Sequence, residues 1–267
     1  RHTPAREGVF NVMDYGAVGN GVANDAPAVR AAVAALIVNG SGELYFPGGH
    51  VYLWDEPSGV SIVGSEYDRL EGVRVRGGAG ARLKLGQPIT TLAPQQYILD
   101  WFYIGFASDV LVEGLIFEGL PVEQQSFEGV YSGRVVHSGA ASHRVTVRDN
   151  VFLNFNSGIA VDHSGAGLAI IAGNYVVNSW AGIWATNTQG QAIITNNFIT
   201  GGGPYNQIYV ERVGAVVGNV IQASGPGIAY TAKWDGAILV TNNYIQSPTP
   251  LRPLMTPDRA LVEGNLF

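Results

Sequence analysis

The second half of the 267-residue sequence repeats one short motif, an Asn followed by two apolar residues. The copies are Asn150-Val151-Phe152, Asn174-Tyr175-Val176, Asn197-Phe198-Ile199, Asn219-Val220-Ile221, Asn243-Tyr244-Ile245 and Asn265-Leu266-Phe267. Successive Asn residues lie 24, 23, 22, 24 and 22 positions apart. A period of this length is typical of a solenoid, in which each repeat buries its apolar side only by stacking on its neighbours.

Each repeat contains three short segments with the apolar alternation of a β-strand. One precedes the Asn, as in Ala192–Thr195, the apolar pair after the Asn forms a second, and a third follows a turn, as in Gly182–Ala185. The sequence therefore predicts an all-β fold, a single-stranded parallel β-helix with three strands per coil of 22–24 residues. An Asn at the repeating corner suits the left-handed backbone region, and stacked Asn side chains can hydrogen-bond. We interpret this Asn ladder as structural and the neighbouring Tyr175 and Tyr244 as packing residues.

The repeat is less regular upstream. Val110–Val112 aligns with Val145–Val147, and the gap of 35 residues predicts a coil with an inserted loop of about 11 residues within 119–131. An earlier coil begins at Val73, and a second irregular excursion is expected over 86–103.

The N-terminal segment predicts a helix that covers the open end of the β-helix. Asn24-Asp25 is a helix-capping pair, Pro27 suits a first turn, and Asn39-Gly40 is a stop signal, so we expect a helix from Ala26 to Val38. We expect one β-helix domain over 1–267, with an N-terminal strand and capping helix in 1–42 and coils in 43–267, irregular to about 143 and regular after it. The sequence stops inside a ladder motif, so further chain or another subunit is expected to cover that end.

The opening of the chain resembles a known superfamily. Phe10-Asn11-Val12-Met13-Asp14-Tyr15-Gly16-Ala17-Val18-Gly19-Asn20-Gly21, then Asn24-Asp25, a helix and Tyr45-Phe46-Pro47-Gly48-Gly49, is similar to the N-terminus of pectate-lyase superfamily (pectin-lyase-like) right-handed parallel β-helix proteins. These include polygalacturonase-related hydrolases, mannuronan C5-epimerases and phage tailspike depolymerases. Asn20 and Asn24 replace two Asp of the usual form. The resemblance implies a right-handed coil, a polysaccharide or oligosaccharide partner, and a secreted, cell-surface or virion location.

Composition excludes several other classes of protein. The net charge of −6 and the presence of only two Lys, Lys84 and Lys233, argue against a nucleic-acid binder. No Cys is present, which removes disulfides, zinc–thiolate sites and Cys nucleophiles. No apolar run reaches the roughly 18 residues of a membrane span, so we expect no membrane insertion. No acidic cluster indicates a calcium site, and we expect no metal and no cofactor.

The third strand of each coil carries the candidate site. With the residue that opens each third strand as position zero, position three is mostly apolar and predicted to point inward, so positions two and four point outward. We expect these outward residues to form an exposed stripe. Position two holds Val135, Ala160, Trp184, Tyr209 and Ala229, and position four holds His137, Asp162, Thr186, Glu211 and Thr231.

Two carboxylates on the predicted stripe suit glycoside hydrolysis. Asp162 and Glu211 lie two coils apart, roughly 9–10 Å between backbones at the usual strand spacing. Inverting glycosidases hold their acid and base roughly 6.5–9.5 Å apart. His137, expected one coil from Asp162, would orient that carboxylate or act as an acid itself. Trp184 and Tyr209 would stack on sugar rings. The residues expected to complete the groove are Tyr205, Arg212, Lys233, Trp234, Asp235 and His163.

Two alternatives remain open beside a polysaccharide hydrolase. A uronate lyase or C5-epimerase would use Lys233, Arg212 or His137. Mannuronan epimerases carry G-Y-G-F-D-P-H-E on the corresponding strand, where this chain has Gly158-Ile159-Ala160-Val161-Asp162-His163-Ser164, so that Asp162 matches, the Tyr is absent and the His is displaced. The polygalacturonase signatures are absent. The other alternative is a non-catalytic structural or glycan-binding β-helix, such as a tail fibre or surface module. Because tailspikes of this superfamily are typically trimers, a homotrimer is one expected assembly.

Overall fold

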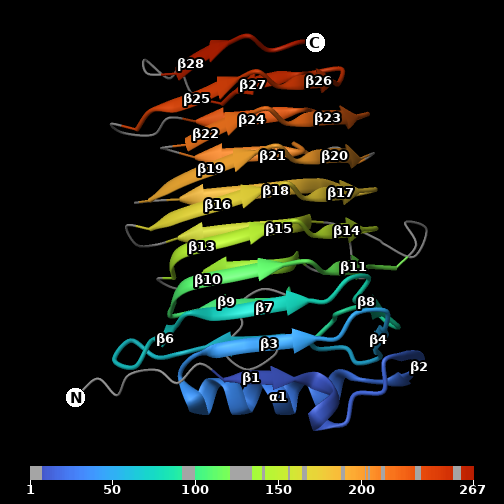
Figure 1. Cartoon of the computed structure of the whole chain (residues 1–267). Helices are drawn as coiled ribbons and strands as arrows, with labels where there is room; N and C mark the ends of the chain where they lie inside the picture. Colours follow the sequence, from blue (N-terminus) through green and yellow to red (C-terminus); the bar gives the residue numbers. More distant parts are fainter. Residues whose placement is uncertain are drawn as a thin grey trace.

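The chain forms a right-handed parallel β-helix, as the sequence predicts (Figure 1). The computed structural model describes residues 8–91, 100–120, 134–139, 142–155, 157–163, 167–187, 190–201, 203, 205–211, 214–231, 236–254 and 260–267. Every pairing between the described strands is parallel, and three sheets run along the stack of coils. Both predicted loop excursions centre on segments outside the described residues, 92–99 and 121–133. The excursion predicted over 86–103 ends earlier than expected, because a strand begins at Asp100.

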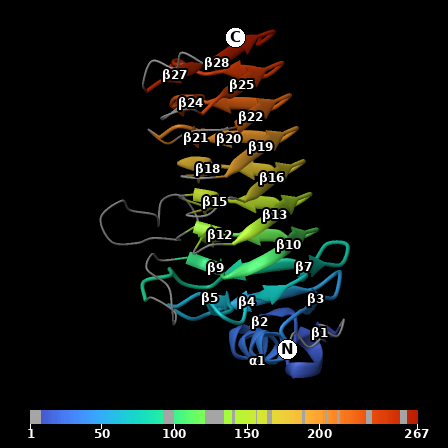
Figure 2. The same cartoon turned by 90° about the vertical axis from the view of Figure 1, so that its left-hand side faces the viewer.

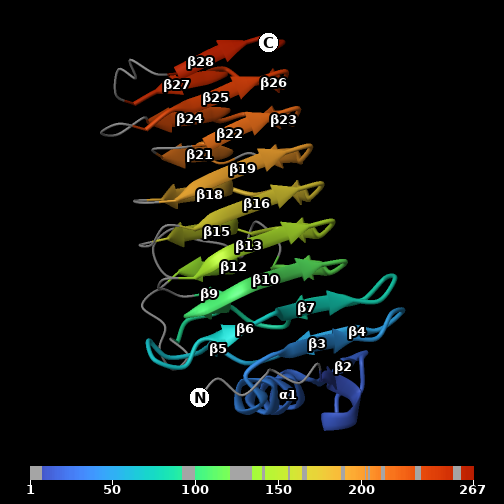
Figure 3. The same cartoon turned by 60° about the vertical axis from the view of Figure 1, so that its left-hand side comes forward.

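Sheet 1 holds the strands that precede the ladder Asn residues, and Figure 3 shows them stacked in front. In stacking order they are β1 (Val9–Asn11), β3 (Gly42–Phe46), β7 (Val73–Gly77), β10 (Ala107–Glu113), β13 (His143–Arg148), β16 (Leu168–Ala172), β19 (Gln191–Thr195), β22 (Gly214–Val217), β25 (Ile238–Thr241) and β28 (Ala260–Glu263), with β6 (Leu70–Glu71) also beside β10.

Sheet 2 follows the Asn corner and sheet 3 follows the next turn. The strands of sheet 2 are β2 (Asn20–Asn24), β4 (Val51–Trp54), β8 (Arg82–Leu85), β11 (Ile116–Glu118), β14 (Val151–Leu153), β17 (Tyr175–Val177), β20 (Phe198–Gly201), β23 (Val220–Ala223) and β26 (Tyr244–Gln246). Those of sheet 3 are β5 (Val60–Val63), β9 (Asp100–Gly105), β12 (Arg134–Gly139), β15 (Ser157–His163), β18 (Ala181–Asn187), β21 (Ile208–Glu211), β24 (Ile228–Thr231) and β27 (Leu251–Pro253), seen edge-on in Figure 2.

The core lies inside the coils and consists of rows of apolar side chains in register. One row on sheet 3 contains Ile159, Ile183, Ile208 and Ile228, all fully buried. Position three is inward as predicted, since the residues described there, such as Val210, are buried. Burial of these rows stabilises the fold, because it contributes roughly 25 cal/mol per Å² of apolar surface removed from water.

The predicted N-terminal helix is present and covers the first coil (Figure 1). A 3₁₀ turn (Val12–Tyr15) precedes it, and α1 (Ala26–Asn39) ends at Gly40, whose φ is 79°. The Asn24 side chain accepts a hydrogen bond from the Ala26 N–H (3.2 Å), whereas Asp25 makes no side-chain cap bond. The buried Asp25 carboxylate instead accepts from the Val18, Gly19 and Leu53 N–H groups, at 2.6–3.3 Å, and so joins the N-terminal segment to β4. None of the helices in the described residues is long and apolar enough to cross a membrane.

The Asn ladder is a continuous chain of buried hydrogen bonds. Asn174 Nδ2 donates to Asn197 Oδ1, and Asn197 Nδ2 donates to Asn219 Oδ1, both at 3.0 Å. The same pattern runs from Asn150 to Asn265. From Asn174 onward each ladder oxygen also accepts the backbone N–H of the Asn one coil before, whereas Asn150 Oδ1 accepts from the Leu115 N–H. Each amide also donates to sheet 1 carbonyls. The ladder therefore satisfies polar groups that would otherwise be buried without partners.

The prediction that the ladder Asn residues themselves adopt the left-handed conformation is wrong. The left-handed residue is the one before each ladder Asn: Asp149, Gly173, Asn196, Gly218, Asn242 and Gly264, with φ between 54° and 67°. Asx and Gly alternate at this corner for a steric reason. A Cβ added to Gly218 would lie 2.8 Å from Asn196 Oδ1, and one added to Gly264 would lie 2.6 Å from Asn242 Oδ1. The Asx side chain of one coil thus occupies the space above the Gly of the next.

Asn197→Ala should lower the free energy of unfolding by about 2 kcal/mol or more, because it leaves buried ladder and backbone groups without partners. The matched control is Asn196→Gly, next in sequence and exposed, which should cost less than about 1 kcal/mol because Gly adopts the same positive φ. Urea denaturation followed by circular dichroism measures both. Equal stability of Asn197→Ala and the wild type would contradict the structural role of the ladder.

Candidate functional site

The outward face of sheet 3 brings together two predicted aromatic residues. Trp184 on β18 is in register with Tyr209 on β21, and their ring centroids lie 5.3 Å apart at an interplanar angle of 53°. Both side chains are half-buried. Strand alternation places them outward because the flanking residues, such as Val210, point into the core. The pair forms an amphipathic surface of the kind that stacks on a flat ligand.

Glu211 lies directly beside this aromatic pair. It is two residues after Tyr209 on the same strand and therefore on the same face. The Tyr209 hydroxyl donates a hydrogen bond to Glu211 Oε1 at 3.1 Å. Burial, followed by the charge and hydrogen bond of Glu211, raises the pKa of Tyr209 to about 12. At neutral pH the Tyr209 phenol is therefore a proton donor that fixes the orientation of the carboxylate.

The predicted exposure of the stripe is wrong at several positions. Glu211 and Thr231 are buried, with exposed fractions of 9% and 1%, and Ala160 and Ala229 are buried as well. For the two Ala residues the cause is the size of their neighbours. Ala160 is in register with Trp184, and Ala229 with Tyr209, so the large rings shield the small side chains. Of the outward residues whose side chains are described, Trp184, Thr186 and Tyr209 remain half-exposed.

His137 occupies a different register from the predicted one. It pairs with Ala160 and Tyr103, whereas the sequence alignment put it opposite Asp162. With His137 and Asp162 both at position four, Gly133 and Gly158 are equivalent at position zero, but β12 and β15 pair Arg134 with Ser157. The shift of two residues moves the His137 backbone along the strand by about 6–7 Å from its predicted place. His137 therefore belongs to the row of Trp184 and Tyr209.

The remaining predicted residues divide into three groups. Asp162 and His163 end β15, where their backbones pair with Thr186 and Asn187, and their side chains, like that of His137, are not among the described ones. Tyr205 is half-buried in the turn before β21. Arg212, Lys233, Trp234 and Asp235 lie outside the described residues.

Gln207 is a site-forming residue that the sequence reasoning did not select. Its side chain is fully buried, and Nε2 donates to the carbonyls of Trp180 and Tyr205, at 3.2 and 3.3 Å. Gln207 therefore holds the turn that leads into β21. The only sequence signal was a Gln where other coils have a Gly that opens the third strand. The Tyr209–Glu211 contact had a clearer signal, because residues i and i+2 of a strand share a face.

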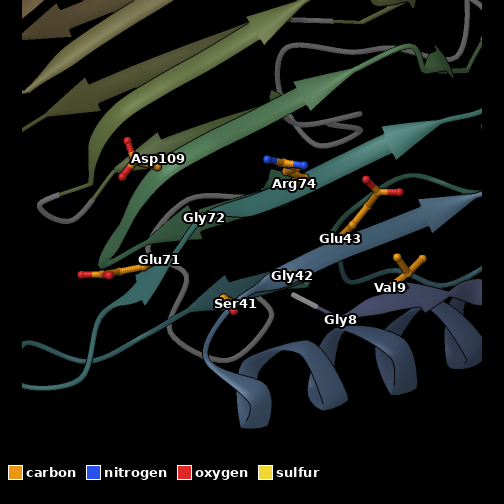
Figure 4. A pocket seen from close by; sticks show the side chains of 9 residues that line it. All are labelled: Gly8, Val9, Ser41, Gly42, Glu43, Glu71, Gly72, Arg74 and Asp109. Carbon is orange, nitrogen blue, oxygen red and sulfur yellow. The ribbon is translucent and has the colours of Figure 1, made fainter. Parts of the chain in front are cut away.

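A separate pocket lies across β3, β7 and the start of β10 on sheet 1 (Figure 4). Two of its carboxylates are engaged in ion pairs with Arg side chains. Arg76 contacts Glu43 and Arg144 contacts Asp109, both at 2.6 Å, and the guanidinium of Arg144 holds the pKa of Asp109 below its ordinary value. These pairs leave the pocket with a mixed, largely neutralised lining rather than a free acidic site. The lining residues are Gly8, Val9, Ser41, Gly42, Glu43, Glu71, Gly72, Arg74 and Asp109.

Comparison with known families identifies the chain. A family model described as periplasmic copper-binding protein (NosD) matches residues 117–255, just over half of the sequence. The chain belongs to the NosD family. The matched segment of this NosD-family chain contains Trp184, Tyr209 and Glu211 on sheet 3.

Individual relatives share the fold or a short stretch. Mannuronan C5-epimerase AlgE3 of Azotobacter vinelandii is 48% identical over 42 residues, which is 16% of this chain and 2% of the relative. The tailspike protein of E. coli bacteriophage HK620, solved as a mutant with a pentasaccharide, aligns with a TM-score of 0.53 and 14% identity, over 96% of this chain and 56% of the tailspike. The Agl-KA catalytic domain aligns with a TM-score of 0.52 and 13% identity, over 99% and 54%. The NosD-family chain thus spans about half of these structures and has their pectate-lyase-like fold.

The copper named in the family description has no fitting donor set in the described part of this NosD-family chain. Copper favours Cys, Met and His ligands. The sequence has no Cys and two Met, and the described residues contain no group of three His, Cys, Asp or Glu side chains suited to a metal ion. The described faces of the coils instead carry aromatic, hydroxyl and carboxylate groups.

The raised pKa of Tyr209 predicts a pH-dependent contribution to stability. A phenol whose folded-state pKa exceeds the ordinary value of 10.0 stabilises the fold below about pH 10, and this contribution disappears as the pH rises to about 12. Glu211→Gln should lower the pKa of Tyr209 part of the way, because burial remains the largest cause. Phenolate absorbance during alkaline titration, compared with Tyr209→Phe as the control, measures this pKa. An unchanged titration in both variants would contradict the Tyr209–Glu211 contact.

Proposed function

We propose that this NosD-family chain binds a polysaccharide along the outward face of sheet 3 and hydrolyses it with Asp162 and Glu211. The observation that carries the proposal is the Trp184–Tyr209 pair beside an oriented Glu211. A carboxylate held next to two stacked aromatic rings combines a sugar-binding surface with an acid–base group. The low charge of the chain favours a neutral or weakly acidic glycan.

The proposed chemistry is acid–base hydrolysis with a water molecule between the two carboxyl groups. One carboxyl protonates the glycosidic oxygen as the bond to the anomeric carbon breaks, and the other carboxylate takes a proton from the attacking water. Two coil spacings separate the backbones of Asp162 and Glu211 by about 10 Å, which suits the wider separation of inverting enzymes. The Tyr209 hydroxyl holds Glu211 during this exchange. His137, whose backbone lies in the row of Trp184 and Tyr209, is proposed as a polar contact for the sugar.

The neighbouring residues have positioning roles in this proposal. Trp184 and Tyr209 stack on the apolar faces of sugar rings and exclude water from them. Tyr205, held through its carbonyl by Gln207, borders the same surface. Arg212, Lys233, Trp234, Asp235 and His163 are proposed to bind the sugar hydroxyls beyond it.

A second candidate is a uronate lyase or C5-epimerase, favoured by the 42-residue stretch that is 48% identical to a mannuronan C5-epimerase. Such an enzyme removes the proton at C5 and needs cations for the uronate carboxylate. Lys233, Arg212 or His137 would serve here. Tyr209, with a pKa of about 12, is suited to donate a proton and not to remove one at neutral pH.

Substrate assays separate these functions. Incubation with neutral and uronic polysaccharides should release reducing ends without the absorbance of unsaturated uronates. That absorbance would support a lyase, a change of uronate configuration without cleavage would support an epimerase, and binding without turnover would support a structural or glycan-binding module.

Asp162→Asn and Glu211→Gln should each lower turnover by about 10²–10⁴-fold with the fold intact, because each removes an acid or base. Glu66→Gln, an exposed loop carboxylate, is the matched control and should keep full activity. Circular dichroism checks folding and reducing-end release measures turnover. Full activity in both site variants would overturn the acid–base pair.

We propose that the chain works outside the cytoplasm, in a secreted, cell-surface or virion setting, and that it assembles as a homotrimer. The family description, which names the periplasm, and the shared tailspike fold support the location. The superfamily resemblance of the sequence supports the trimer. Sedimentation equilibrium should give three times the mass of the chain, and the mass of one chain at all concentrations would contradict the trimer.

A further inference from the structure

The outward face of sheet 2 carries a row of aromatic side chains. Tyr175 on β17, Phe198 on β20 and Tyr244 on β26 occupy equivalent register positions, with Val220 of β23 between the last two. Tyr175 and Tyr244 are exposed, with fractions of 55% and 41%, so the expectation that they are packing residues is wrong. The rings of Tyr175 and Phe198 have centroids 5.6 Å apart. At the usual strand spacing the row is about 14 Å long and runs along the axis of the coils.

Polar side chains border this aromatic row on both sides. Two residues farther along the same strands, and therefore on the same face, lie Thr200, Gln222 and Gln246. Both Gln residues are exposed, and no hydrogen bond within the described residues engages their side-chain amides. Two residues before Phe198 and Tyr244 lie Asn196 and Asn242, the exposed left-handed corner residues. From β20 to β26 the apolar surface is thus one residue wide beside amide and hydroxyl groups, whereas on β17 the residue beyond Tyr175 on the same face is Val177.

The same part of sheet 2 is free of charge. Strands β14, β17, β20, β23 and β26 contain no Asp, Glu, Lys or Arg. The charged residues of this sheet lie towards the N-terminal end, where Arg82 and Lys84 pair with Glu118. An anionic or cationic ligand would find no counter-charge on these strands, and so the surface fits a neutral one.

We propose that this row, defined as Tyr175, Phe198 and Tyr244 with Gln222 and Gln246, is a binding surface for a neutral polysaccharide lying along the coil axis. Aromatic faces stack on the C–H faces of sugar rings, and the adjacent amides bond the hydroxyl groups at the ring edges. From β20 to β26 the strip is one residue wide beside polar groups and so matches a linear chain, whereas a protein partner requires a broader apolar centre. The strip lies on another sheet from Trp184 and Glu211 (Figure 1), and it does not depend on catalysis there.

The test compares binding at the two sheets. Affinity electrophoresis and calorimetry use hydroxyethyl cellulose, galactomannan and xyloglucan as neutral probes, with polygalacturonate and alginate as charged ones. The wild type should bind at least one neutral probe, and Tyr175→Ala combined with Tyr244→Ala should weaken that binding by about tenfold or more. Trp184→Ala removes the ring on sheet 3 and leaves this row intact, so the affinity that remains in that variant measures binding at sheet 2. Tyr67→Ala, an exposed loop Tyr, is the matched control, and Tyr175→Phe with Tyr244→Phe should bind like the wild type because the rings remain.

Three results would overturn the proposal. The first is the absence of binding to every neutral probe. The second is loss of that binding in Trp184→Ala with full binding in the double Ala variant, which would assign all binding to sheet 3. The third is a change of sedimenting mass in the double Ala variant with unchanged binding, which would make the row a protein interface. Thermal unfolding of each variant confirms that it is folded, as expected for exposed side chains.

Discussion

The structure depends on the register between coils, and the buried Asn ladder fixes that register at one corner. Each ladder amide donates to the next Asn and to carbonyls of sheet 1, while its oxygen accepts from the neighbouring coil. A slip of one residue would break this chain and bury its donors without partners, and it would also turn every inward side chain outward. The left-handed residue before each Asn provides the turn, and the alternation of Asx and Gly leaves room for it.

Stacking in fixed register turns single positions of the repeat into rows along the molecule. The rows on the three outer faces differ in chemistry because each outward position is free to vary once the inward ones are apolar. Sheet 3 carries the Trp184–Tyr209 pair and Glu211, whereas sheet 2 carries aromatic rings between amides. On sheet 1, ion pairs such as Arg76–Glu43 lie near the helix-capped end, and half-exposed aliphatic residues such as Ile170 follow. The outward polar and aromatic side chains thus lie on a scaffold that is stabilised by the buried apolar rows and the Asn ladder.

The sequence predicts the register of strands correctly where the repeat length is regular. It does not predict the exposure of side chains, which depends on the size of neighbours from other coils. The pairing of Trp184 with Tyr209 followed from counting residues between repeats, because the loops in those coils have similar lengths. The register of His137 did not follow, since the irregular stretch before β12 removed the reference point for counting. Counting also places side chains only on an inner or outer face. It cannot show that Glu211 is buried, that Trp184 shields Ala160, or that Tyr175 and Tyr244 stay exposed.

The sequence by itself determined the parallel β-helix, its coil length, the capping helix and the ladder, because a repeating pattern of apolar residues and Asn permits few other ways to bury the chain. It also determined which side chains share the outward face of each strand. Only the tertiary structure decided which coil neighbours meet, how deeply Glu211 lies, and that Tyr209 holds it. These properties depend on the volumes and directions of side chains from separate coils, which are far apart in sequence and become neighbours only when the coils stack.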